Sequence, residues 1–413
     1  MRFSWTFALV CAYASWAQVQ KFPLVDVQVS GNQTLPAAGI IATAGLRLGQ
    51  AAAVTDFDSG AKRLFETGMF SSVNYRYDPK TVNNTAGYAL TWQVRESAAN
   101  DNVRLDFPGI EEQELWKEMK NANALVDLRM PANAAAVEYY RRTIQEALRK
   151  RGREEEIITK NEADLATGAS WTVFRPANLP RISGVRFEGN TSISSNSLQG
   201  VLTQASFLGQ EYSEHDVRHL LEVNLKPMFE ELGHLTVKFP KVALDSGTVM
   251  VAIEEGRVWT LGKVEIAGDS IPVEEMQKTA NFAQGKLANW KEFLIAISRA
   301  RTVLSRDGYL GAKATPVSSY QDDTGIVNVT VRVEKGRQFL FGALELNGLS
   351  PADRQTAQSL WTLASGSPMN GPYVDDYLRT LLRSLNGSYK KGINTEMRPR
   401  PGTNTIDVAF TFR

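Results

Sequence analysis

The chain has 413 residues, of which 43% are hydrophobic and 22% are charged, and its formal net charge is +1. This length allows several domains, and the composition is typical of globular modules that bury apolar cores. A net charge so close to zero argues against a nucleic-acid-binding protein, because such proteins carry an excess or a stripe of basic residues.

Residues 1–17 have the pattern of a cleavable secretory signal peptide. Arg2 precedes an apolar stretch from Phe3 to Ala14, and the small-x-small ending Ser15-Trp16-Ala17 follows. The alternative, an uncleaved anchor, is disfavoured because a spanning helix needs about 20 apolar residues. The only cysteine, Cys11, lies in this segment. We therefore expect a secreted mature chain with no thiol chemistry and no disulfide.

The rest of the chain repeats one pattern five times: a strand, two helices, a second strand and a third strand. The glycine that closes the first strand recurs at steps of 78, 80, 79 and 80 residues, at Gly31, Gly109, Gly189, Gly268 and Gly348. The glycine that ends the second helix follows 37 to 44 residues later, at Gly68, Gly152, Gly233, Gly308 and Gly387. A fixed period of this length indicates a tandem array of similar modules.

We number the predicted modules 1 to 5, and they span residues 22–96, 97–179, 180–256, 257–336 and 337–413. Almost no linker separates them, since Glu254-Glu255-Gly256 leads directly into the strand that begins at Thr260. Short joints restrict the angles between neighbouring domains, so the sequence predicts an extended but articulated rod.

Modules 1 and 2 differ in how clearly they follow the pattern. The second helix of module 1 places Phe57, Ala61, Leu64 and Phe65 on one predicted apolar face. Module 2 is the most divergent, because Arg153 to Glu156 crowd its second strand with charge. The basic cluster from Arg141 to Arg153 lies at a predicted helix end, where cations complement the helix dipole. A surface for anionic lipid or for a partner is the alternative interpretation.

In module 3, Pro227 lies inside the second helix and predicts a kink. The segment Leu235-Thr236-Val237-Lys238-Phe239 is predicted to be the second strand, with Leu235, Val237 and Phe239 facing inward and Thr236 and Lys238 outward. The alternation is the most regular of the five modules, and a lone lysine protects such a strand from aggregation without blocking pairing.

Module 4 is the clearest example of the pattern. Phe293, Ile297, Ala300 and Leu304 share one face of its second helix, which ends at Asp307-Gly308. Tyr309 to Thr315 is predicted to be the second strand, and the β-branched stretch from Ile326 to Glu334 the third. We predict that Gly68, Gly233 and Gly308 adopt positive φ as helix caps.

No catalytic or cofactor site is predicted. His215 and His219 lie four residues apart on a helix, but the glutamate that zinc proteases place beside the first histidine is absent. The sequence contains no phosphate-binding glycine loop, and no spacing of Ser, Asp or Glu singles out an acid–base pair. We therefore expect a non-enzymatic protein with no metal and no cofactor, whose recurring glycines, together with Tyr309, are structural anchors.

The repeated elements resemble the POTRA domain. That family has a first strand ending in Gly-Asn or Gly-Asp, here Gly31-Asn32, Gly189-Asn190 and Gly268-Asp269, and a Gly-aromatic pair after the second helix, here Gly308-Tyr309. Its third strand ends in Glu-Gly, here Glu255-Gly256. The resemblance implies an α+β fold of five βααββ modules, each a three-stranded mixed sheet covered by two helices, with the third strand central and the second strand at the edge.

Five tandem POTRA domains resemble the periplasmic part of BamA-like outer-membrane protein assembly factors. We expect no barrel within residues 1–413, because sixteen strands alone would need on the order of 150 residues. The resemblance implies a periplasmic location, close to the outer membrane and with at most peripheral membrane contact. The partners would be unfolded outer-membrane proteins, or a separate outer-membrane barrel and its lipoproteins.

The site expected from this resemblance is an open strand edge that binds extended segments by strand addition, and Leu235 to Phe239 is the predicted edge. Two alternatives remain. One is a structural scaffold in envelope organisation or cell division, and the other is a fragment split from a BamA-like protein.

Overall fold

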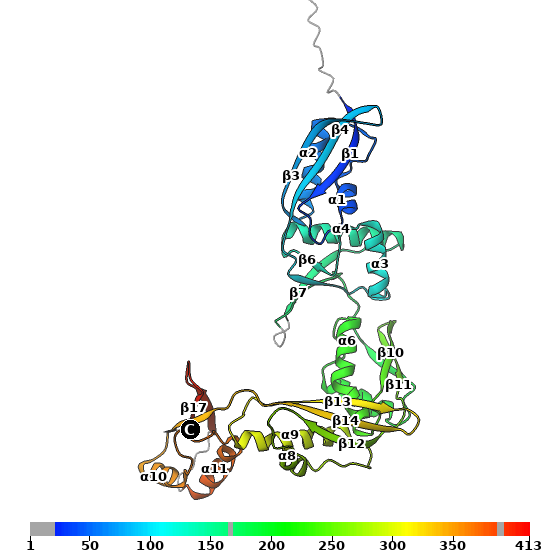
Figure 1. The fold of residues 1–413 in the computed structure, drawn as a ribbon. Helices are drawn as coiled ribbons and strands as arrows, with labels where there is room; N and C mark the ends of the chain where they lie inside the picture. The colour runs from blue at the N-terminus through cyan, green and yellow to red at the C-terminus, as the bar shows by residue number, and fades with distance from the viewer. Residues whose placement is uncertain (1–20, 164–167, 386–391) are drawn as a thin grey trace, which may run out of the picture. The chain divides into compact units, whose positions relative to one another are not determined.

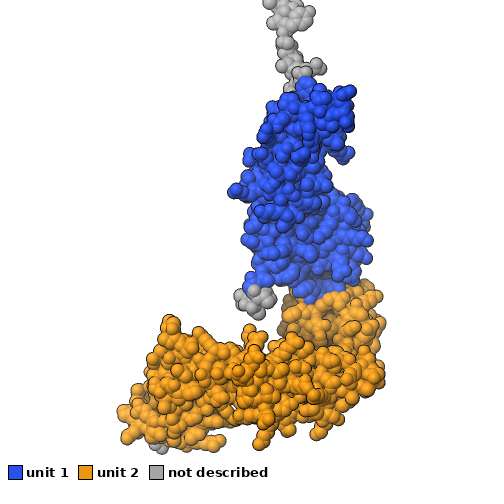
Figure 2. Space-filling view, viewed as in Figure 1, with its two compact units in different colours: residues 1–181, 211–215 blue, residues 182–210, 216–413 orange. Residues whose placement is uncertain are grey.

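The computed structural model describes residues 21–163, 168–385 and 392–413 (Figure 1). The predicted signal peptide and Gly387 lie outside these residues. By internal contacts the chain divides into two compact units, residues 1–181 with 211–215 and residues 182–210 with 216–413, which Figure 2 distinguishes by colour. Within the described residues, no helix is both long enough and apolar enough to cross a lipid bilayer.

Modules 1 and 2 each contain four strands and two helices. In module 1 these are β1 (Phe22–Ser30), α1 (Ala37–Ala44), β2 (Ala51–Ala52), α2 (Val54–Glu66), β3 (Phe70–Val82) and β4 (Thr85–Glu96). In module 2 they are β5 (Asp101–Leu105), α3 (Glu112–Ala122), β6 (Arg129–Met130), α4 (Ala134–Lys150), β7 (Ile157–Ala163) and β8 (Ser170–Pro176).

Modules 3 to 5 each contain three strands. Module 3 has β9 (Gly184–Glu188), α5 (Ser195–Gln204), α6 (Glu214–Leu220), η1 (Leu221–Leu225), α7 (Lys226–Glu231), β10 (Lys238–Asp245) and β11 (Thr248–Glu254). Module 4 has β12 (Thr260–Ala267), α8 (Val273–Ala280), α9 (Trp290–Arg306), β13 (Lys313–Gln321) and β14 (Ile326–Glu334). Module 5 has β15 (Leu340–Asn347), α10 (Pro351–Leu360), α11 (Gly371–Ser384), β16 (Ile393–Pro399) and β17 (Thr405–Phe412).

Each sheet has the predicted mixed topology. The third long strand of the module lies between the other two, parallel to the first and antiparallel to the second, as β14 lies between β12 and β13. The sheets of modules 1 and 2 have four strands rather than the three predicted, because the two-residue strands β2 and β6 pair with the first strand. In modules 3 to 5 the same place holds only single bridges, Arg181 to Glu211, Thr260 to Leu287 and Leu340 to Pro368.

The core of each module lies between the helices and one face of its sheet. Along β14, Val327, Val329, Val331 and Val333 are buried and alternate with more exposed residues, as expected of a strand with one covered face. All four predicted core residues of α9 are also buried. In α2 the prediction was wrong for Phe65, which is 57% exposed. Gly60 is buried there instead, because the ring of Trp92 packs against it.

The second helix of module 3 departs from regular geometry just before Pro227. Residues Leu221–Leu225 form a π-helical turn between α6 and α7. Proline has no N–H for the hydrogen bond to the residue four positions earlier, and a π-turn is one way for a helix to accommodate that loss. The predicted irregularity at Pro227 is therefore present as a π-turn.

Candidate functional site

The second strand of every module lies at an edge of its sheet. These edge strands are β3, β7, β10, β13 and β16, and each pairs on one side only, with the central strand. An edge strand leaves part of its backbone N–H and C=O groups without a partner in the sheet, so another extended chain can pair with it. Each sheet therefore carries the structural requirement for strand addition.

The predicted edge segment of module 3 is placed differently from the expectation. Only Lys238 and Phe239 belong to β10, while Leu235, Thr236 and Val237 form the turn that leads into it. Leu235, Val237 and Phe239 are buried, so the inward half of the predicted pattern holds even though the strand assignment was wrong. The pattern is misleading here because residues in a turn that packs onto the core also alternate.

The paired edge in module 3 starts later in the chain. Pro240 follows directly, and the register of β10 against β11 shifts between Lys238 and Lys241. Proline removes a donor and a bulge twists the strand, and both are features that protect edges against pairing. Continuous pairing resumes from Lys241 to Asp245, which is the part of β10 open to strand addition.

In modules 2, 3 and 4 a helix-ending glycine precedes the second strand and explains why that strand begins late. After α9, Gly308 N donates to Ser305 O and Tyr309 N to Leu304 O, the pair of bonds that closes a helix through a left-handed glycine. Gly233 and Gly152 end α7 and α4 in the same way. The second strand starts five residues after each, so Tyr309 belongs to the cap and β13 begins at Lys313 rather than at Tyr309.

The cap glycines also contact the next module. Their φ angles are 70° for Gly68, 83° for Gly233 and 87° for Gly308, which confirms the predicted left-handed caps. Gly233 O accepts a 2.9 Å bond from Trp259 N, and Gly308 O accepts a 2.9 Å bond from Phe339 N. At Gly68 the carbonyl accepts from the Asn133 side chain. Sequence reasoning assigned these glycines to single modules and missed that they join two.

The glycines that close the first strands lie against the third strands. A Cβ at Gly31, Gly189, Gly268 or Gly348 would overlap a carbonyl oxygen, respectively of Val94, Ile253, Val333 or Phe412. At Gly109 in module 2 an added Cβ would meet nothing within 4 Å, and the same is true of the helix-ending glycine Gly152. Close backbone approach therefore explains the anchor in four modules, whereas at Gly109 only the positive φ of 76° calls for glycine.

A third set of recurring glycines was missed by the sequence analysis. Gly49, Gly209, Gly285 and Gly366 lie in the loop between the two helices, with φ between 78° and 84°. The N–H groups of Gly49, Gly285 and Gly366 donate to first-strand carbonyls, as Gly285 N does to Leu261 O, and Gly209 N donates to Ile182 O just before β9, all at 2.7 to 2.8 Å. The signal was present in the sequence, because Leu-Gly-Gln occurs at 48–50 and again at 208–210.

Acidic residues at the end of two third strands hold the loop after the first strand. Glu255 accepts hydrogen bonds of 2.6 to 2.8 Å from the backbone and hydroxyl groups of Thr191 and Ser192. Burial alone would raise the pKa of Glu255, but these hydrogen bonds outweigh it and lower the pKa to about 2. Glu96 accepts equivalent bonds from residues 33–35 in module 1, and its pKa is lowered as well. The Glu-Gly ending thus has a structural role.

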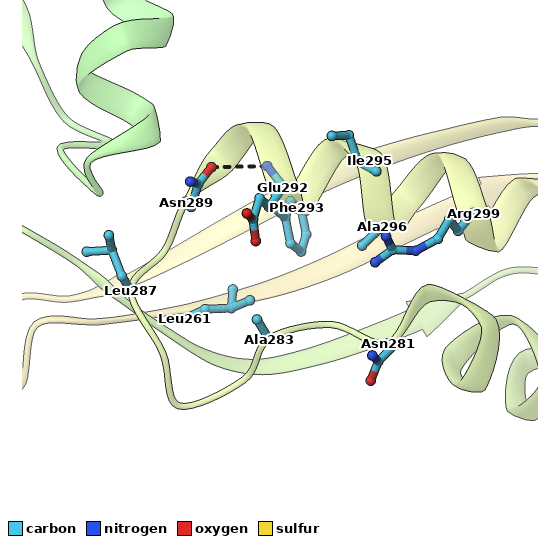
Figure 3. A pocket seen from close by; sticks show the side chains of 10 residues that line it. All are labelled: Leu261, Asn281, Ala283, Leu287, Asn289, Glu292, Phe293, Ile295, Ala296 and Arg299. Atoms are coloured by element: carbon cyan, nitrogen blue, oxygen red, sulfur yellow. Dashed lines mark hydrogen bonds between the residues drawn. The ribbon is translucent and has the colours of Figure 1, made fainter.

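Module 4 contains a groove of about 280 Å³ between α9 and the loop that joins α8 to α9 (Figure 3). Leu261 and Phe293 are buried at its base, and Leu287 and Ile295, 46% and 49% exposed, lie at its mouth. Glu292 and Arg299 also line it. Figure 3 shows Ala283 and Leu287 on the loop, and Glu292, Phe293, Ile295, Ala296 and Arg299 on the helix.

The paired histidines of module 3 and the basic cluster of module 2 are the remaining candidates from the sequence. Within the described ranges, no group of three or more His, Cys, Asp or Glu side chains is placed to hold a metal ion. In the basic cluster, Arg151 pairs with Glu118, Arg149 with Glu154, and Arg153 with Glu155. These ion pairs favour the structural interpretation of the cluster over a lipid-binding surface.

One family model matches part of the chain. Residues 260–336 match the family model described as POTRA, surface antigen variable number repeat. The chain is similar to BamA POTRA3-5 from Haemophilus influenzae, with 16% identity and a TM-score of 0.41, over 57% of this chain and 97% of that one. No curated protein matches the chain.

Two further solved structures are more distant. POTRA1-3 of Omp85 from Anabaena has 10% identity and a TM-score of 0.19, over 76% of this chain and 96% of that chain. CdiB from Escherichia coli has 14% identity and a TM-score of 0.20, over 54% of this chain and 36% of that chain. The family match covers almost all of module 4, so the POTRA resemblance is confirmed for residues 260–336, which have an α+β fold.

Proposed function

We propose that this protein is a periplasmic, non-enzymatic receiver in outer-membrane protein assembly or secretion, which holds extended segments of unfolded outer-membrane proteins by strand addition. The observation that carries the proposal is that the second strand is an edge in all five sheets of the described residues. Backbone pairing reads little sequence, which suits a receiver of many clients.

The family match and the neighbours named above support the same role. POTRA domains of BamA and Omp85 proteins, and CdiB, are the structures that this chain is similar to. Several edges on one chain also offer weak sites that act together, because a client bound at one edge is held at high effective concentration near the next.

The edges differ in how much backbone they offer. β3 is the longest, with 13 residues, and pairs with β4 in continuous register from Ser72 to Val82. In module 3 the usable part is Lys241 to Asp245, since Pro240 and the bulge precede it. We therefore propose β3 and the second half of β10 as the main sites, in place of the segment Leu235 to Phe239.

Amide hydrogen exchange on the full chain tests the proposal. The probe is a 12-residue peptide of alternating apolar and polar residues from an outer-membrane strand, and its control has proline at every second position. We expect the first peptide to slow exchange in β3 and in Lys241 to Asp245, without change in the central strands β4 and β11. The mechanism is wrong if no edge strand gains protection, or if the proline peptide protects equally.

A further inference from the structure

We propose that the groove between α9 and the α8–α9 loop of module 4 is a docking site for an amphipathic helix of a partner protein. The site is separate from the strand edges and uses a different mode of recognition. It would add a stable partner to a protein whose edges bind extended clients.

Strand addition is not available in this groove. The backbone at its base is that of β12, and both polar groups of Leu261 are already used: Leu261 N donates to Lys286 O, and Leu261 O accepts from Gly285 N. Thr260 also bridges to Leu287. A partner must therefore be recognised through side chains.

The groove has the size and character of a side-chain pocket. Its volume of about 280 Å³ lies at the lower limit of small-molecule sites, which measure about 300 to 1,000 Å³. Ile295 and Leu287 expose nearly half of their surface at the mouth, while Leu261 and Phe293 form an apolar base. An apolar side chain inserted from outside would remove part of this exposed apolar surface from water.

The charges along α9 favour a helical partner. On α9, Ile295 and Ala296 lie three and four residues after Glu292, and Arg299 lies seven residues after it. An acidic side chain, an apolar surface and a basic side chain therefore share one helix face. The acid and the base are seven residues apart, about 10 Å along the axis. A partner helix that lies along α9 complements this face if it carries a basic residue, one or two leucines and an acidic residue at the same spacing.

The charged groups are already held in place. Arg299 Nε and Nη2 donate to Ala280 O at 3.2 and 2.7 Å, which uses two of its five N–H groups and fixes the guanidinium at the end of α8. Asn289 Oδ1 accepts from Glu292 N at 3.1 Å and fixes the start of α9. Groups fixed before binding lose less conformational freedom when a partner docks.

The first test uses two fluorescent 18-residue helical peptides and the full chain. One has Lys, Leu, Leu and Glu at positions i, i+3, i+4 and i+7, and the other has Gln in place of both Lys and Glu, so that it lacks the charges in either helix direction. Fluorescence anisotropy should give about threefold to tenfold tighter binding for the charged peptide, because only that peptide forms attractive pairs with Glu292 and Arg299. Equal affinities of the two peptides would overturn the charge argument and with it the proposal.

The second test compares Ile295→Asn with Leu294→Asn. These neighbours on α9 are 49% and 47% exposed, but only Ile295 lines the groove. We expect Ile295→Asn to weaken the complementary peptide about tenfold and Leu294→Asn to leave it unchanged, with both variants folded by circular dichroism. Equal losses would place binding elsewhere on α9. A proline-interrupted peptide that bound as well as the helical one would exclude a helical partner.

Discussion

Modules 3 and 4 have the same order of strands and helices, yet they hold the loop after the first strand with opposite charges. In module 3 the buried carboxylate of Glu255 accepts from the loop residues Thr191 and Ser192. In module 4 the corresponding position is Lys335, whose Nζ donates to Ser270 O at 2.7 Å and lies 4.8 Å from the centre of the Tyr309 ring. The loop thus accepts either an anion at its N–H groups or a cation at a carbonyl.

The comparison teaches which features the fold requires. Both modules keep a glycine where the first strand ends against the third, at Gly189 and Gly268, although only Gly189 has positive φ. Both also keep the helix-ending glycine and the glycine between the helices. Backbone contacts are therefore common to the two modules, while the side chains that stabilise the loop differ.

The largest effect is expected at the glycines that close the first strand. Gly268→Ala should lower the free energy of local unfolding by about 1 to 3 kcal/mol, because the new methyl overlaps Val333 O and the strands must separate. Gly189→Ala should cost about 1 to 2 kcal/mol more, since alanine is also strained at a φ of 87°. Amide exchange in β11 and β14 measures both. Gly109→Ala, which has positive φ but open space, is the control for backbone strain alone, and a cost as large as that of Gly189→Ala would refute the role of backbone overlap.

Lowering the pH should reduce the stability of module 3 and leave the stability of module 4 unchanged. The pKa of Glu255 is lowered from 4.5 to about 2, so its stabilising contribution is complete above pH 4.5 and is lost as the pH falls toward 2. The linked free energy is on the order of 2 to 3 kcal/mol. We expect exchange in β9 and β11 to accelerate over this range, while β12 and β14 do not respond. Glu255→Gln should remove the difference, and a persistent acid response in that variant would point to another group.

Valine at the cap glycines should show that the contact at the joint between modules 4 and 5 contributes more stability than the contact at the joint between modules 3 and 4. Gly308→Val should cost about 1 kcal/mol or more from backbone strain, and more again because its Cβ overlaps Phe339 O. Gly233→Val has the same strain, but its Cβ meets the flexible end of Leu287 at 2.7 Å, which can move. We therefore expect Gly308→Val to destabilise more, by calorimetry and by exchange in β15. Gly152→Val reports strain alone, and equal effects of all three would mean that the joint contacts contribute nothing.

The smallest effect is expected at Lys335. Lys335→Met should cost about 0.5 to 1 kcal/mol, because the bond to Ser270 O and the contact with Tyr309 are both lost at a partly exposed site. Exchange of the amides from Ser270 to Val273 measures the change. A loss above about 2 kcal/mol would show that module 4 depends on this lysine as module 3 depends on Glu255.

The sequence analysis predicted the fold well but placed the start of the second strands too early. The glycine period and the apolar alternation led to the correct order of strands and helices, because both arise from local geometry. The second strands were placed too early, at Tyr309 and Leu235, because the cap after a helix-ending glycine is also apolar and packs on the core. Phe65 was assigned to the apolar face on helix period alone, whereas it is exposed and Gly60 is buried beneath Trp92.

The sequence by itself determined the repeated α+β module, because a periodic pattern of glycines and apolar residues specifies where strands and helices begin and which face each one buries. Only the tertiary structure decided which backbone carbonyl each glycine accommodates, that the cap glycines contact the next module, and that Glu292, Ile295 and Arg299 line one groove. The glycine contacts join residues that are distant in sequence, from 26 positions between Gly233 and Trp259 to 65 between Gly268 and Val333. Local periodicity carries no information about contacts at such separations.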